Sequence, residues 1–210
     1  MVEIVVEMNV RVGALTRAKK GFTANGDAYL VEEISHGILI CVIDGIGHGE
    51  HAERAARVCV KTIREYIHSR EDFTLTGLFY ACDTALRDTD GVVMAAVMIK
   101  NGDDRVYFAG VGNITTRIIG REKIYPISTG GIIGYNMSRV REKRYPYKSG
   151  DLILMHSDGI RSGIKEEILT QLYNQDEERI AEEIFREYSR ETDDATIVVV
   201  RERVGNWSDS

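Results

Sequence analysis

Four aspartates share one local setting, the point where an apolar strand meets a turn. Asp27 opens the segment "AYLVEE", and Asp193, followed by Asp194, opens "ATIVVV". Asp44 closes "ILICVI" and Asp158 closes "LILMHS", and a glycine follows each of these two. A carboxylate at the end of a buried strand loses water and stays ionised only if positive charge compensates it. No Lys or Arg accompanies all four aspartates. Each of them therefore either caps a solvated turn or, if the four converge, shares a divalent cation with the others.

Antiparallel hairpins make convergence plausible, because the start of one strand and the end of the next lie at the same sheet edge. A hairpin would pair Asp27 with Asp44, and Asp158 with Asp193 repeats the arrangement around the C-terminal helices. Mg²⁺ and Mn²⁺ take oxygen ligands and keep several waters, so a few carboxylates suffice. Two such ions can share a hydroxide and hold a phosphoryl group in line. The four aspartates thus predict metal-assisted hydrolysis.

The stretch "VIDGIGHGE" supplies space around Asp44. With Gly45, Gly47 and Gly49 the chain can turn sharply, and the carbonyl of Gly45 could coordinate an ion directly. A helix beginning near Glu50 would add free backbone N–H groups. No protein nucleophile is needed, and the sequence contains no GxSxG elbow and no GxxxxGK[ST] phosphate loop.

The elements that must position these residues follow from the apolar periodicity. Period-2 alternation in "MVEIVVEMNVRV" predicts a strand with one buried face, and "DAYLVEE" and "GILICVID" predict two more. Apolar residues at i, i+3, i+4 spacing predict helices over residues 50–70, 74–87, 164–173 and 177–190. Strands joined by short breaks fill residues 90–126, a loop covers 128–143, and "GDLILMHSD" and "ATIVVVRER" are further strands. This order favours an α+β fold with antiparallel sheets covered by helices, in one compact unit.

Composition narrows the class of protein. The net charge of −6 disfavours a nucleic-acid surface, and no apolar run approaches the ~18–20 residues of a membrane span. The acidic N-terminus lacks a signal peptide's positive patch, and the tail "VGNWSDS" has no pattern. The three cysteines, Cys41, Cys59 and Cys82, are predicted to be buried thiols in a reducing cytoplasm.

Six ordered motifs, "NGDAY", "VIDGIGHG", "AGVGN", "GGIIG", "LILMHSDG" and "DDATIVVV", resemble the metal-dependent protein phosphatase 2C family. The resemblance is greatest to its small bacterial stress and sporulation branch and covers about residues 1–203, with residues 204–210 as a disordered tail. It implies a four-layer αββα sandwich and two Mn²⁺ or Mg²⁺ ions. It also implies a metal-activated water that hydrolyses phosphoserine or phosphothreonine, on a stressosome or anti-anti-sigma type protein. The metal ligands it implies are Asp27, Asp44, the Gly45 carbonyl, Asp158 and Asp193, with Asp44 bridging and Asp194 as a second choice.

The sequence departs from this family pattern in two places. "GFTANGD" lacks the arginine that holds substrate phosphate in animal-type members, so Lys19, Lys20 or Arg17, or the metals alone, would take that role. Animal-type members have a histidine two residues after the bridging aspartate, where this chain has Ile46. His48 could replace it as the proton donor, or could be a structural residue of the turn.

Three other interpretations remain open from the sequence. His48 and His51 form an HxxH pair, but no third His or Cys clusters with it, which disfavours zinc. The basic loop around Arg139, Arg141 and Arg144 is either solvated or docks an acidic phosphoprotein. A catalytically weak phosphatase-like domain that regulates a signalling partner by docking is the main alternative to an enzyme.

Overall fold

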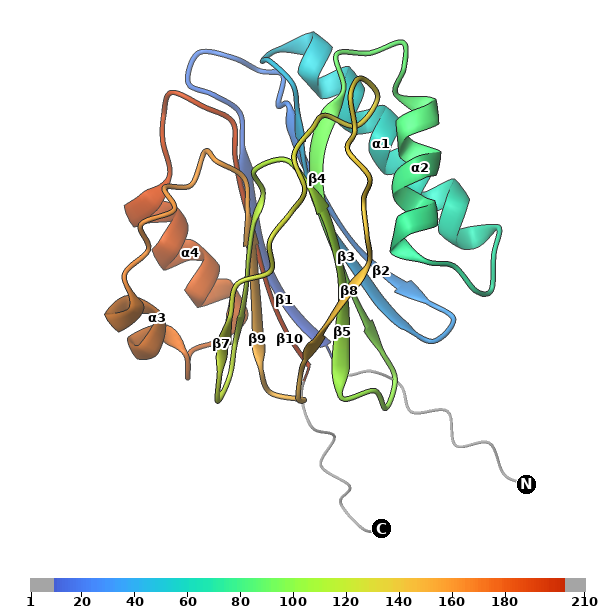
Figure 1. Ribbon diagram of the computed structural model, residues 1–210. Helices are drawn as coiled ribbons and strands as arrows, with labels where there is room; N and C mark the ends of the chain where they lie inside the picture. Colours follow the sequence, from blue (N-terminus) through green and yellow to red (C-terminus); the bar gives the residue numbers. More distant parts are fainter. Residues whose placement is uncertain (1–9, 203–210) are drawn as a thin grey trace, which may run out of the picture.

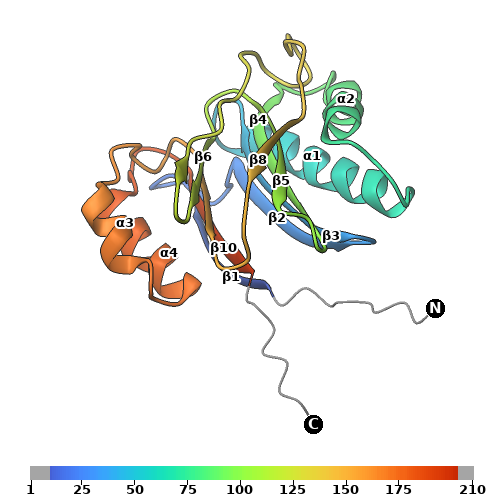
Figure 2. The same cartoon turned by 60° about the horizontal axis from the view of Figure 1, so that its bottom comes forward.

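The computed structural model describes residues 10–202 as two antiparallel five-stranded sheets packed face to face, with helices on both outer faces (Figures 1 and 2). One sheet has the strand order β1 (Val10–Arg17), β10 (Ala195–Glu202), β9 (Leu152–His156), β6 (Thr115–Ile119) and β7 (Lys123–Ile124). The other has the order β2 (Asp27–Ile34), β3 (Gly37–Gly45), β4 (Val92–Lys100), β5 (Arg105–Val111) and β8 (Lys143–Pro146).

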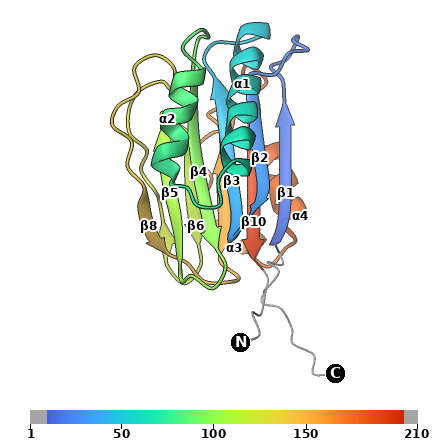
Figure 3. The same ribbon diagram turned by 90° about the vertical axis from the view of Figure 1, so that its right-hand side faces the viewer.

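Helices α3 (Glu166–Leu172) and α4 (Glu177–Tyr188) cover the first sheet, and α1 (Glu50–His68) and α2 (Leu75–Ala85) lie side by side over the second (Figure 3). Three buried apolar layers separate these four structural layers. The predicted four-layer α+β sandwich is confirmed. Two predictions, the start of the first strand and the disordered tail, fall on residues outside the described range.

The central strands are buried on both faces. Along β4, Val93, Ala95 and Val97 face the opposite sheet, while Met94 and Ala96 face the helices. Such strands read as continuous apolar runs because neither face meets water. The cysteine prediction also holds, since Cys41, Cys59 and Cys82 are free and buried in the layer beneath α1 and α2.

Helix α1 starts directly against the end of β3, and this contact shapes the region around Asp44. Ala52, Ala55 and Ala56 are buried on its inner face. A Cβ added at Gly45 would lie 2.3 Å from the carbonyl oxygen of Ala52, so only glycine allows this approach. The helix start is thereby held beside the end of the strand that carries Asp44.

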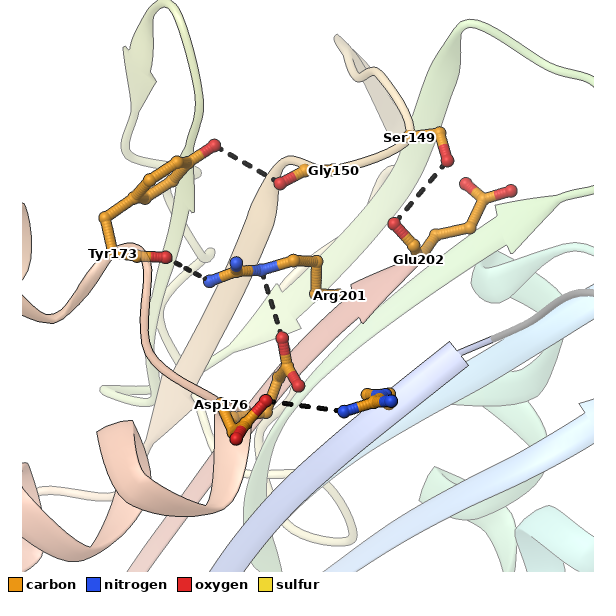
Figure 4. A network of polar contacts seen from close by, with 8 residues as sticks. Ser149, Gly150, Tyr173, Asp176, Arg201 and Glu202 are labelled. Atoms are coloured by element: carbon orange, nitrogen blue, oxygen red, sulfur yellow. Dashed lines mark hydrogen bonds and ion pairs between the residues drawn. The ribbon is translucent and has the colours of Figure 1, made fainter. Parts of the chain in front are cut away.

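Helix α4 is held against its sheet by an ion pair and hydrogen bonds at the C-terminal end of β10 (Figure 4). Nε of Arg201 lies 3.1 Å from Oε1 of the buried Glu177, an ion pair without the alignment of a hydrogen bond. A second nitrogen of Arg201 donates to the carbonyl of Tyr173 at 2.6 Å, and the Tyr173 hydroxyl donates to the Gly150 carbonyl. The network joins α4 and the segment before it to β10 and the turn before β9.

Differences from the sequence expectation are confined to weakly patterned segments. Strand β1 continues to Arg17, β7 is only two residues long, and β8 was not predicted. Strand β8, "KRYP", is an edge strand that is mostly exposed and charged, so it carries no apolar alternation.

Candidate metal centre

A cleft of about 370 Å³ opens at one end of the sandwich, where both sheets contribute carboxylates. Asp44 is the second-to-last residue of β3, Asp158 follows β9, and Asp193 precedes β10. The rest of the lining comes from the turn after Asp44 and from four residues of other segments: Gly45, Ile46, Gly47, Val93, Gly112, Asn113 and Gly130. Residues more than a hundred positions apart thus meet at one rim.

Asp27 lies beside this cleft as the register partner of Asp44, which is the hairpin pairing that the sequence predicted. Its side chain is 5% exposed. Oδ2 accepts a hydrogen bond from the Ser157 hydroxyl at 2.6 Å, while Oδ1 is buried and has no hydrogen-bond partner among the described residues. Burial raises the pKa of Asp27 to about 7, although hydrogen bonds from Ser157 and Thr196 oppose the shift. An unpartnered buried carboxylate oxygen is a group that a bound cation would satisfy.

Two carboxylates that line the cleft, those of Asp44 and Asp193, also have raised pKa values. Burial raises the pKa of Asp44 to about 8, and the neighbouring Asp27 and Asp158 add to the shift. Burial also raises the pKa of Asp193, with Asp158 as the second cause, whereas the Lys19 ammonium acts in the opposite direction. Negative charges are therefore crowded together with little compensation, and a divalent cation would relieve them.

The donor set consists of carboxylates and a backbone carbonyl, which suits Mg²⁺ or Mn²⁺ and does not suit zinc. Within residues 10–202, no three acidic, histidine or cysteine side chains already stand close enough together to hold an ion. His51, of the HxxH pair, is exposed and lies 3.8 Å from Asp90.

The two adjacent aspartates before β10 have different surroundings. Asp193 lines the cleft. Asp194 is buried, and its two oxygens accept backbone hydrogen bonds from Lys19 at 2.7 Å and Gly26 at 2.9 Å. The carbonyl of Gly26 in turn accepts from the N–H of Gly45 at 2.9 Å. Asp194 thus ties the β1–β2 loop to the end of the sandwich where the cleft lies, and Asp193 is the one of the two that lines the cleft.

The three other predicted site residues, Lys19, Lys20 and His48, lie in different surroundings. Nζ of Lys19 lies 5.5 Å from the Phe22 ring centre, within electrostatic reach of Asp193. Lys20 is turned toward Glu191, with which it forms an exposed ion pair at 2.6 Å. His48 is exposed, and its ring packs 5.1 Å from that of Phe22 beside the cleft. Of these three residues, Lys19 is the one brought toward the carboxylates.

Two residues of the site lie within the sequence motifs, although the sequence predicted no role for them. Nδ2 of Asn113, in "AGVGN", donates to Oδ2 of Asp158 at 2.9 Å. Ser157, in "LILMHSDG", holds Asp27 from the other sheet. Local sequence gave no signal for either, because both partners are distant in the chain.

Comparison with known proteins places these features in a family. Residues 35–203 match the family described as stage II sporulation protein E (SpoIIE). Stage II sporulation protein E of Bacillus subtilis is 28% identical over 91% of this chain, and the match spans only 26% of that longer protein. Phosphoserine phosphatase RsbX of the same organism is 22% identical, over 75% of this chain and 79% of RsbX.

Solved structures agree with this assignment. A structure from the study "The bacterial stressosome: a modular system that has been adapted to control secondary messenger signaling" is 35% identical, with a TM-score of 0.83 over 91% of this chain and 99% of that one. A crystal structure of RsbX in complex with magnesium has a TM-score of 0.80 at 18% identity, over 94% and 96% of the two chains. With its aspartates gathered at one end of a double-sheet sandwich, the chain belongs to the SpoIIE family and has the fold of the protein phosphatase 2C enzymes.

Proposed function

We propose that this protein is a metal-dependent serine/threonine phosphatase that dephosphorylates a stress-signalling protein. The observation that carries the proposal is the cleft in which Asp44, Asp158 and Asp193 meet beside Asp27. Family membership and the likeness to phosphoserine phosphatase RsbX support it. We take residues 1–203 as one phosphatase domain.

The residues that would hold two divalent cations, Mn²⁺ or Mg²⁺, are Asp27, Asp44, the Gly45 carbonyl, Asp158 and Asp193. RsbX binds magnesium, which supports this choice of ion. When bound, such cations lower the pKa of water and neutralise charge on a phosphoryl group. Asp44 is the proposed shared ligand.

The chain's own residues would orient these groups and the substrate. Ser157 fixes one oxygen of Asp27 and leaves the other free, and Asn113 orients Asp158. Lys19 is the proposed contact for substrate phosphate. Lys20 is the less favoured candidate because it forms an ion pair with Glu191. His48, exposed at the rim, is the proposed proton donor to the leaving serine.

The proposed substrate is a phosphorylated stressosome or anti-anti-sigma type protein in the cytoplasm. The likeness to RsbX and to the structure from the stressosome study supports this partner. The free buried cysteines support a reducing compartment. Over residues 10–202, no helix combines the length and apolarity that crossing a membrane requires.

The Asp44→Asn variant tests the proposal. We expect hydrolysis of p-nitrophenyl phosphate to require Mn²⁺, to stop with a chelator, and to fall by at least about 100-fold in the variant. The fold should survive, because the substitution removes one of several mutually repelling charges. In chelator, the variant's thermal midpoint should therefore equal or exceed that of the wild type.

A docking module without turnover is the alternative function. It predicts Mn²⁺ binding by calorimetry with no hydrolysis of any phosphoserine peptide. Undiminished hydrolysis by Asp44→Asn would reject the proposed site itself.

A further inference from the structure

Five cationic residues border one side of the cleft in a chain whose net charge is −6. We call this set the basic rim. Three belong to the end of β1 and the loop after it, one follows Asp158, and one follows α4: Arg17, Lys19, Lys20, Arg161 and Arg190. Lys20, Arg161 and Arg190 are exposed, and the other two are partly exposed.

Backbone hydrogen bonds attach the basic rim to the cleft. The N–H of Arg190 donates to the carbonyl of Gly159, which directly follows Asp158, at 2.8 Å. The N–H of Lys19 donates to the Asp194 carboxylate at 2.7 Å. The rim is thus fixed beside the Asp158–Asp193 side of the site.

Most of the rim's charge is not neutralised by carboxylates. Arg161 binds the carbonyls of Glu187 and Tyr188, and Arg17 binds the carbonyl of Arg190 at 2.6 Å. These carbonyls, at and just beyond the C-terminal end of α4, position the guanidinium groups without cancelling their charge. Over the described residues, Lys20 is the one rim member with an ion pair.

On the Asp44 side of the cleft, the start of α1 carries acidic side chains beside the exposed Arg54. The first turn of α1 carries Glu50 and Glu53. Asp90 lies beside His51 of the same turn. The α4 side of the cleft thus carries cationic side chains, whereas acidic side chains outnumber Arg54 at the start of α1. Such asymmetry selects and orients charged partners.

We propose that the basic rim binds an acidic segment of the phosphoprotein substrate, next to its phosphorylated residue. The inference rests on the proposed function, because it assigns the flanking sequence of that substrate. The phosphorylated residue would reach the carboxylate cleft while its acidic flank lies along the β1–β2 loop and the end of α4. Charge in the flank, rather than apolar contact, would distinguish the protein substrate from a small phosphate ester.

The test uses the full chain and two fluorescein-labelled serine peptides, one with acidic residues on both sides of the serine and a twin with Asn and Gln in their place. Unphosphorylated peptides report rim binding by fluorescence anisotropy without any turnover. At about 50 mM salt we expect the acidic peptide to bind about tenfold tighter, and at about 300 mM salt the preference should shrink. Arg190→Ala should weaken it and Arg190→Glu should abolish it.

Arg141→Glu is the matched control, since Arg141 is exposed on the loop beside the start of α2, where Glu142 binds the N–H of Leu75. It should leave the preference intact. With phosphorylated peptides and Mn²⁺, Arg190→Glu should lower kcat/KM for the acidic peptide by about tenfold and change p-nitrophenyl phosphate hydrolysis by less than about twofold.

Equal binding of the two peptides, equal losses in Arg190→Glu and Arg141→Glu, or tighter binding of a short single-stranded RNA would overturn the rim proposal. Absence of hydrolysis of every phosphorylated probe, with the Arg190-dependent peptide preference intact, would instead overturn the proposed function and leave the rim supported. Thermal midpoints of the Arg190 variants within about 2 °C of the wild type would exclude misfolding as the cause.

Discussion

His156, Ser157 and Asp158 are consecutive residues at the end of β9, and each serves the site in a different way. The Asp158 carboxylate lines the cleft, and the Ser157 hydroxyl crosses to Asp27 on the other sheet. The His156 ring is 1% exposed; its Nδ1 donates to the Ser157 carbonyl at 2.8 Å, and its Nε2 has no partner among the described residues. A neutral imidazole is therefore part of the buried support behind the carboxylates.

The first prediction concerns His156 and pH. Burial lowers the pKa of His156 to about 4, from 6.5. Between these values the unfolded chain binds a proton that the folded chain does not. The stability that the neutral, buried His156 contributes to the folded state is thus fully present above pH 6.5. It is lost as pH falls through about 4, and the free energy of unfolding falls by roughly 3 kcal/mol.

Comparison with His156→Asn isolates this effect, because asparagine can keep the hydrogen bond to Ser157 and does not titrate. Urea unfolding in chelator should show the wild type losing about 3 kcal/mol relative to the variant between pH 7 and pH 4. The relative measure is needed because Asp27 and Asp44 also take up protons in this range. A difference that stays constant with pH would contradict the prediction.

Among the secondary-structure elements, α4 covers one sheet, and its last carbonyls, together with the segment just after it, position arginines of the basic rim. At its N-terminal end the helix backbone packs onto Gly13 of β1, and the Arg201–Glu177 pair fixes the same turn. The contact at Gly13 is closer than any side chain allows. The position of α4 therefore depends on a residue that has no side chain.

Gly13→Ala should shift the helix. A Cβ at this position would lie 2.1 Å from the carbonyl oxygen of Glu177, and backbone cannot yield as a flexible side chain can. We expect a loss of about 2–3 kcal/mol in the free energy of unfolding by urea. Gly163→Ala, where the added Cβ meets nothing within 4 Å, should stay within about 0.5 kcal/mol of the wild type. Equal effects of the two substitutions would show that the contact at Gly13 is relaxed in solution.

The apolar pattern of the sequence predicted most of the strands and helices and an antiparallel α+β fold, because core segments are rich in apolar residues; the four-layer sandwich was implied by the family resemblance. The hairpin argument also placed Asp27 opposite Asp44, since that pairing needs only two adjacent strands. The roles of Ser157, Asn113 and Asp194 were not predictable, because their partners lie 130, 45 and 168 to 175 residues away. Edge strand β8 was not predicted for a different reason: it has no buried face and therefore no apolar alternation.

At the scale of the whole molecule, the site couples the two sheets. Asp27 and Asp44 belong to one sheet, whereas Asp158 and Asp193 flank strands of the other. A cation held by both pairs would bind the folded sandwich and not the unfolded chain. Binding would therefore stabilise the entire fold against unfolding.

Mn²⁺ at about 100 times its Kd should raise the free energy of unfolding by about 2.7 kcal/mol. Asp44→Asn and Asp193→Asn, which change proposed ligands on different sheets, should each remove most of this gain. Calorimetric thermal unfolding with and without Mn²⁺ would measure it. Full Mn²⁺ stabilisation in either variant would mean that the ion sits on one sheet alone.

The pairing of β1 with β10 has a consequence for how such a domain can be assembled into larger proteins. Val10 and Glu202 are register partners, about 25 Å of strand away from the Arg17–Ala195 end where the carboxylates gather. Val10 and Glu202 thus lie side by side at the end of the sandwich opposite the carboxylate cleft. A further domain fused at either of these strand ends would therefore leave the carboxylate cleft accessible.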